Sequence, residues 1–127
     1  MLVTELYTGP RYNLYAMVIN NSCIVQAYID SLEEKQLTQL FSLFNRILEH
    51  GPPTNDRKFK NLGDNIYELK TYSGVRILCF FGGSFLRNTL ILTHGFDKGG
   101  DKQLRREKEK AIAWLEDYSE NAEIVEI

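Results

Sequence analysis

The chain has 127 residues, of which 43% are hydrophobic and 25% are charged, as in one soluble globular domain. No apolar run approaches the roughly 20 residues that a membrane-spanning helix needs. The first residues lack the basic and then apolar pattern of a secretory signal. Cys23 and Cys79 have apolar neighbours, so we expect both to be reduced core residues of a cytoplasmic protein.

The net charge of −2 is distributed unevenly along the chain. Residues 51–114 carry twelve basic and seven acidic side chains, whereas residues 115–127 carry five acidic and no basic ones. The middle block can therefore face a polyanion although the whole protein is acidic. A solvated mixed surface is the alternative, because charge alone says little about a specific partner.

The first half of the chain predicts two strands followed by two helices. A short strand over 2–7 precedes one over 12–19, whose two apolar faces suit a strand covered on both sides. Apolar residues recur at helical spacing over 22–29, and a capping-box pattern at Ser31 begins a longer helix. Gly51 and the two prolines after it end this helix, so the two helices are expected to form an αα-hairpin.

The second half changes to the period of β-strands. Short turns make neighbouring strands antiparallel, and four strands are expected, at 57–62, 65–71, 75–81 and 86–94.

Glycines then break the chain at Gly95 and at 99–100, and Asp101 is expected to cap a last helix that runs to about Tyr118. The acidic tail over 119–127 is either disordered or an edge strand. The order of elements predicts a two-layer α+β fold in one domain over 1–118. Its two N-terminal helices would pack on an antiparallel meander sheet with a C-terminal helix.

Three segments of the second half carry a recognisable pattern. Residues 60–70 read K-N-L-G-D-N-I-Y-E-L-K, residues 74–81 read G-V-R-I-L-C-F-F and residues 90–98 read L-I-L-T-H-G-F-D-K. In this order they resemble toxins of the RelE/ParE superfamily, closest to its HigB-like, phage-derived branch. Glu107 and Ala111 follow the pattern of the family's last helix. Lys70 stands where the family has arginine, Gly99 stands where it has a second lysine, and the proline that usually opens the last helix is absent.

The resemblance implies a RelE-like fold and the toxin of a type II toxin–antitoxin pair. Its implied activity is that of a metal-independent endoribonuclease, an mRNA interferase that cuts translated mRNA on the ribosome. The implied partners are mRNA, the ribosome and a cognate antitoxin, expected to be a small helix-turn-helix protein. No cofactor and no membrane are implied.

Two alternatives stay open. One is a ParE-like toxin that binds DNA gyrase without RNase activity, and the other is an inactive homologue that acts as a binding or repressor module. Arg76, His94 and Lys98 favour the nuclease, whereas Lys70 and Gly99 favour the alternatives.

Metal-free RNA cleavage needs a small set of side chains. The 2′-hydroxyl must be deprotonated and held in line with phosphorus, the departing 5′ oxygen must be protonated, and charge on the phosphate must be neutralised. Arginine and lysine neutralise charge, and histidine exchanges protons near neutral pH. We therefore predict Arg76, His94 and Lys98 as catalytic residues. A guanidinium in an apolar strand is costly unless it faces a groove or a partner, and for Arg76 the structural alternative is pairing with Glu68.

Further cationic and aromatic residues are predicted to bind RNA. Basic side chains either contact phosphates or are simply solvated, and an aromatic side chain after a strand either stacks on a base or fills the core. These candidates are Lys58, Lys60, Lys70, Phe96, Lys102, Arg105 and Arg106. No metal signature is present, because the cysteines are far apart and the two histidines lack clustered carboxylates.

Overall fold

Two strands open the chain, which the computed structural model describes over residues 1–127. Strands β1 (Leu2–Thr8) and β2 (Asn13–Ile19) precede the two-residue β3 (Ser22–Cys23). Helices α1 (Ile24–Asp30) and α2 (Glu34–His50) follow. The second half contains β4 (Phe59–Gly63), β5 (Ile66–Lys70), β6 (Val75–Phe81), β7 (Thr89–Asp97), α3 (Asp101–Glu120) and β8 (Glu123–Ile124).

The sheet is mixed, with the strand order β4-β5-β6-β7-β2-β1-β8 and with β3 paired to β2. The predicted antiparallel meander is confirmed for β4 to β7. However, β2 joins β7 in parallel, and β8 from the acidic tail joins β1 in parallel as an edge strand. The prediction of a purely antiparallel sheet was therefore wrong. Two helices and four strands separate β2 from β7 in the chain, so no short turn dictates their relative direction.

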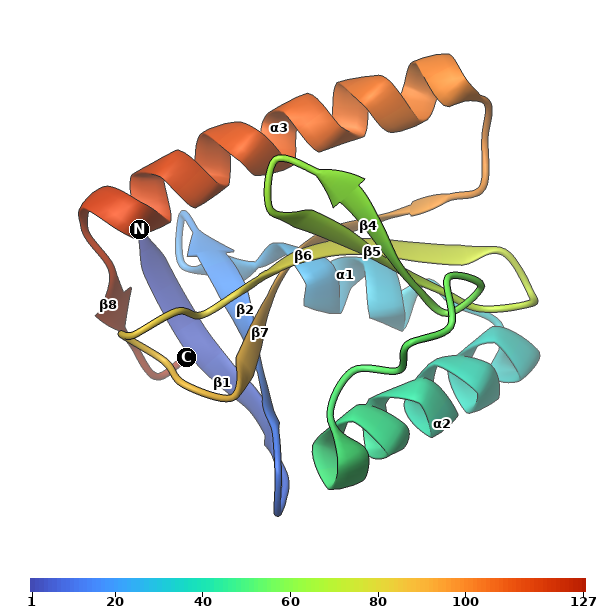
Figure 1. The fold of residues 1–127 in the computed structure, drawn as a ribbon, viewed down its shortest axis with the longest axis horizontal. Helices are drawn as coiled ribbons and strands as arrows, with labels where there is room; N and C mark the ends of the chain where they lie inside the picture. The colour runs from blue at the N-terminus through green and yellow to red at the C-terminus, as the bar shows by residue number, and fades with distance from the viewer.

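Helices cover both faces of the sheet, as Figure 1 shows, with α1 and α2 on one side and α3 on the other. Alternate residues of β6 serve the two cores: Ile77 packs in the cluster that includes Phe44 of α2, and Leu78 packs in the cluster that includes Ala111 of α3. The predicted two-layer arrangement is thus wrong. The central strands are apolar on both faces, and each face needs its own cover.

Gly95 lies inside β7 and does not end the strand. The Tyr28 ring of α1 packs directly on the backbone at this position, where a β-carbon would overlap it. The Tyr28 hydroxyl donates a hydrogen bond to the carbonyl oxygen of Phe96 at 3.1 Å. The glycine therefore permits close approach of helix and strand, and β7 continues to Asp97.

The helix starts differ by one to three residues from the sequence prediction. Glu33 forms the capping box of α2 with Gln36, whose Oε1 accepts the backbone N–H of Glu33 at 3.0 Å. Ser31 ends α1 instead, donating its hydroxyl to the carbonyl oxygen of Tyr28 at 2.6 Å. The cap of α3 is Gly100, so Asp101 is its first residue.

Both cysteines are free, as expected, with Cys79 buried and Cys23 half-buried. None of the helices combines the length and the hydropathy that crossing a bilayer would take.

Candidate functional site

The register of the meander aligns charged side chains across its strands. Lys70 of β5 lies opposite Arg76 of β6, and Arg76 lies opposite Phe96 of β7. Two residues before Lys70 on β5, Glu68 lies opposite Lys60 of β4. Because alternate residues of a strand share a face, these side chains are all on the side of the sheet that α3 covers.

The row borders a hollow of about 190 Å³ between the sheet and the start of α3, which we name the arginine groove. It is lined by Lys60, Glu68, Lys70, Arg76, Phe96, Lys98, Gly99, Gly100, Asp101 and Leu104. Five of the residues predicted from sequence thus meet here, namely Lys60, Lys70, Arg76, Phe96 and Lys98. With four cations against two carboxylates, the groove favours an anion.

Arg76 is held in place by the backbone around it. Its Nη1 donates to the carbonyl oxygens of Thr71 at 3.0 Å and Val75 at 2.9 Å. Its Nε lies 3.9 Å from Oε2 of Glu68, and the side chain is 12% exposed. The guanidinium therefore pairs with Glu68 and lines the groove at once, and its Nη2 has no hydrogen-bond partner within the protein.

Glu68 is a buried carboxylate among cations. Burial raises the pKa of Glu68, and the charges of Arg76, Lys70 and Lys60 only partly offset this effect. A carboxyl group with a raised pKa that borders a groove is a candidate for proton transfer. From the sequence, Glu68 was expected only as a partner of Arg76. The available signal was a lone carboxylate between the hydrophobic residues of a strand.

His94 lies beneath α3 and does not line the arginine groove. Its ring centroid is 5.8 Å from that of Phe96 and 5.1 Å from that of Trp114. Nδ1 lies 3.0 Å from the Thr93 hydroxyl oxygen, and Nε2 lies 3.3 Å from Oε2 of Glu107. From the sequence, His94 was expected at the end of a strand. Because β7 continues past it, the side chain lies instead in the covered interior of the sheet.

His94 and Glu107 have complementary protonation states. Burial lowers the pKa of His94, against the opposing effect of the Glu107 charge. For Glu107, burial alone would raise the pKa, but the hydrogen bond from Lys110 and, once the imidazole is protonated, the attraction of His94 outweigh it and lower the pKa. At neutral pH a neutral imidazole therefore faces a carboxylate, and Nε2 lacks a well-aligned hydrogen-bond partner.

We expect protonation of His94 to lower the Tm of the protein as the pH drops below about 6.5, the ordinary pKa of histidine. Because the pKa of His94 is lower in the folded chain, the unfolded chain binds more protons in this range. The stabilisation is complete above that pH and is lost as the pH falls through the folded pKa. Glu107 titrates in a separate window, below its ordinary value of 4.5.

Thermal unfolding followed by circular dichroism at pH 7.5 and pH 5.0 measures this loss, with His94→Gln as the comparison. Between the two pH values, the Tm of the variant should fall less than the Tm of the unaltered chain. An equal loss in both proteins would mean that His94 is not the responsible group.

The remaining predicted residues lie elsewhere. Lys102, Arg105 and Arg106 are exposed on α3 and line neither of the two grooves described here. Lys58 lines a second and larger hollow, which we name the lateral groove. It is bordered by Thr38, Gln39, Ser42, Leu43, Arg46, Asn55, Arg57, Lys58, Lys70, Thr71 and Tyr72.

These features define a class: small α+β proteins with a mixed sheet, in which cations and a buried carboxylate converge on one groove. Residues 27–116 match the family described as phage-derived Gp49-like proteins (DUF891), and the chain belongs to this family. The match includes all three segments that suggested the resemblance. The family is toxin-like and related to the RelE and HigB toxins, and membership is consistent with a toxin of a toxin–antitoxin system. No curated protein matches the chain.

Proposed function

We propose that the protein is the toxin of a type II toxin–antitoxin pair and cuts translated mRNA as a metal-independent endoribonuclease. The observation that carries this proposal is the convergence of Arg76, Lys98 and two further lysines on one groove beside Glu68. Guanidinium and ammonium groups bind phosphate, and a partly desolvated site strengthens that interaction. Membership of a toxin-like family supports the biological setting.

The groove offers a group for each part of the reaction. Glu68 accepts the proton of the 2′-hydroxyl, and the 2′ oxygen then bonds to phosphorus. The bond from phosphorus to the 5′ oxygen breaks, which gives a cyclic phosphate end and a 5′-hydroxyl end. Arg76 neutralises the charge that builds up on the phosphate, through its unpaired Nη2, and Lys98 donates a proton to the departing oxygen.

His94 has a positioning role in this proposal. Its ring packs behind Phe96, which lines the groove, so it supports the wall on which a base can stack. This differs from the direct catalytic role predicted from sequence.

The proposed partners follow from the same surface. An mRNA target implies the ribosome and the cytoplasm as the place of action. The cognate antitoxin, expected to be a helix-turn-helix protein, would cover the arginine groove with an acidic or amphipathic segment, since opposite charges at an interface attract.

Induction of the chain alone in a bacterium should arrest growth and translation, because the proposed target is mRNA in use. Primer extension should then reveal new 5′ ends within coding regions. Arg87→Ala is a matched control, since it removes an exposed arginine outside both grooves and should leave the arrest unchanged. Normal growth with verified soluble expression would count against any toxin and favour an inactive binding module.

A ParE-like toxin that binds DNA gyrase is the second candidate. The placement of His94 favours this candidate. His94 is the one histidine in the three segments that resemble the family, and it does not line the arginine groove. Growth arrest with intact mRNA and damaged DNA in the same experiment would support this alternative.

A further inference from the structure

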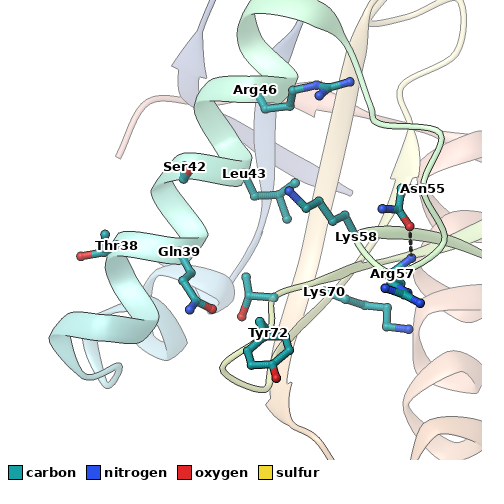
Figure 2. A pocket seen from close by; sticks show the side chains of 11 residues that line it. Thr38, Gln39, Ser42, Leu43, Arg46, Asn55, Arg57, Lys58, Lys70 and Tyr72 are labelled. Atoms are coloured by element: carbon teal, nitrogen blue, oxygen red, sulfur yellow. Dashed lines mark hydrogen bonds between the residues drawn. The ribbon is translucent and has the colours of Figure 1, made fainter.

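The lateral groove is a cationic surface that the proposed chemistry does not use. It encloses about 630 Å³ between α2 and the strands β4 and β5 (Figure 2). Arg46 comes from α2, Arg57 and Lys58 come from the loop before β4, and Lys70 ends β5. No carboxylate lines the groove, and none of these four cations forms an ion pair. In a protein with a net charge of −2, such a set is a local excess of positive charge.

An exposed aromatic side chain stands at the rim of the lateral groove. Tyr72 is 98% exposed, although it occupies the tight turn between β5 and β6. The turn is fixed to α2, because Gln39 Oε1 accepts the backbone N–H of Ser73 at 2.8 Å. The hydroxyl groups of Thr71 and Ser73 lie 3.2 Å apart and form a hydrogen bond within the turn. The fold thus presents a ring to solvent that packs on nothing within the protein.

Lys70 connects the two grooves. It lines both of them, and in Figure 2 its side chain runs away from α2. Its Nζ lies 3.4 Å from the carbonyl oxygen of Asp56, in the loop that carries Arg57. A chain of cations therefore passes around the end of β5, from the α3 face of the sheet to the α2 face.

We propose that the lateral groove is a second RNA subsite, in which single-stranded RNA continues from the arginine groove past Lys70 and stacks a base on Tyr72. This inference rests on the proposed function and names its substrate class. A cationic track with an aromatic platform binds single strands through the backbone and any base. The path turns from one face of the sheet to the other, which suits a flexible single strand and not a duplex.

Anisotropy of labelled oligouridylates of 4 and 12 nucleotides tests the proposal, with 2′-O-methyl groups to prevent cleavage. The unaltered chain should bind the longer probe more tightly. In the Arg46→Ala/Arg57→Ala variant, the affinity for the longer probe should fall toward the affinity for the shorter probe. The slope of log affinity against log salt should become shallower by about 1.4, because each phosphate contact of a single strand contributes about 0.7.

Tyr72→Ala should weaken binding of the longer probe by roughly 5- to 150-fold, the range for one base stacked on an aromatic ring. Tyr72→Phe keeps the ring and should retain the affinity. All of the altered side chains are exposed, so the Tm of each variant should match that of the unaltered chain. The matched control Arg11→Ala/Arg87→Ala removes the same charge outside both grooves and should bind normally.

Unchanged binding of the longer probe by Arg46→Ala/Arg57→Ala overturns the inference, and so does an equal loss in the control. If that variant binds RNA normally but no longer retains a co-expressed partner, the groove serves an acidic protein segment instead. Cleavage is a separate readout. If RNA binds in the lateral groove but mRNA stays intact in cells, only the proposed function is contradicted. If mRNA is cleaved but no RNA binds in the lateral groove, only this inference is contradicted.

Discussion

Arg76→Ala is expected to lower mRNA cleavage by about 100- to 1,000-fold, the usual effect of removing one donor that stabilises transition-state charge. The reason is geometric: Nη1 is engaged by two backbone carbonyl oxygens, which leaves Nη2 for the phosphate. Cleavage of a translated reporter mRNA, scaled to the amount of folded protein, measures the loss. Growth arrest should disappear in parallel.

Stability must be measured beside cleavage, because Arg76→Ala also leaves Glu68 buried without its adjacent cation. Some fall in Tm is expected for that reason. Arg76→Lys is the matched variant: it keeps a positive charge for Glu68 but lacks the planar set of donors. It should melt near the unaltered chain and still cleave poorly. If Arg76→Ala melts early and its folded fraction cleaves at the normal rate, Arg76 is a structural residue.

Gly95→Ala should lower the Tm on the order of 5–15 °C, since overpacking a core typically costs about 1–3 kcal/mol. The added β-carbon would overlap the Tyr28 ring, so α1 has to move away from β7. Thermal unfolding of Gly95→Ala measures the effect.

A double-mutant cycle identifies the cause. In the Tyr28→Ala background the ring is gone, so Gly95→Ala should cost much less there than in the unaltered chain. Equal costs in the two backgrounds would show that Tyr28 is not the obstacle and that the glycine is needed for its backbone alone.

The sequence was most informative where structure depends on near neighbours. Periodicity and turn residues were enough for the meander of β4 to β7 and for three helices. Long-range pairing was not predictable in this way. The parallel contact of β2 with β7 depends on how distant segments pack, and so does the third layer, in which α3 covers the face of the sheet opposite α1 and α2.

The same distinction explains the predicted site. Lys60, Lys70, Arg76, Phe96 and Lys98 meet because short hairpins fix their registers. His94 was misplaced because Gly95 was expected to break the strand, whereas β7 continues through it and the Tyr28 ring of a distant helix packs on its backbone. The lateral groove was missed because its cations come from a helix, a loop and a strand end that only the tertiary fold unites.

The two hydrogen bonds that Arg76 donates to the backbone have a consequence for binding entropy. A mobile arginine side chain carries about 2 kcal/mol of rotamer entropy, which it loses when it grips a ligand. In this protein much of that freedom is already lost on folding, because Thr71 and Val75 hold one end of the guanidinium. A phosphate that reaches Nη2 meets a preorganised donor and gains affinity without a further ordering cost. The flexible lysines around it can then adjust to the shape of the strand.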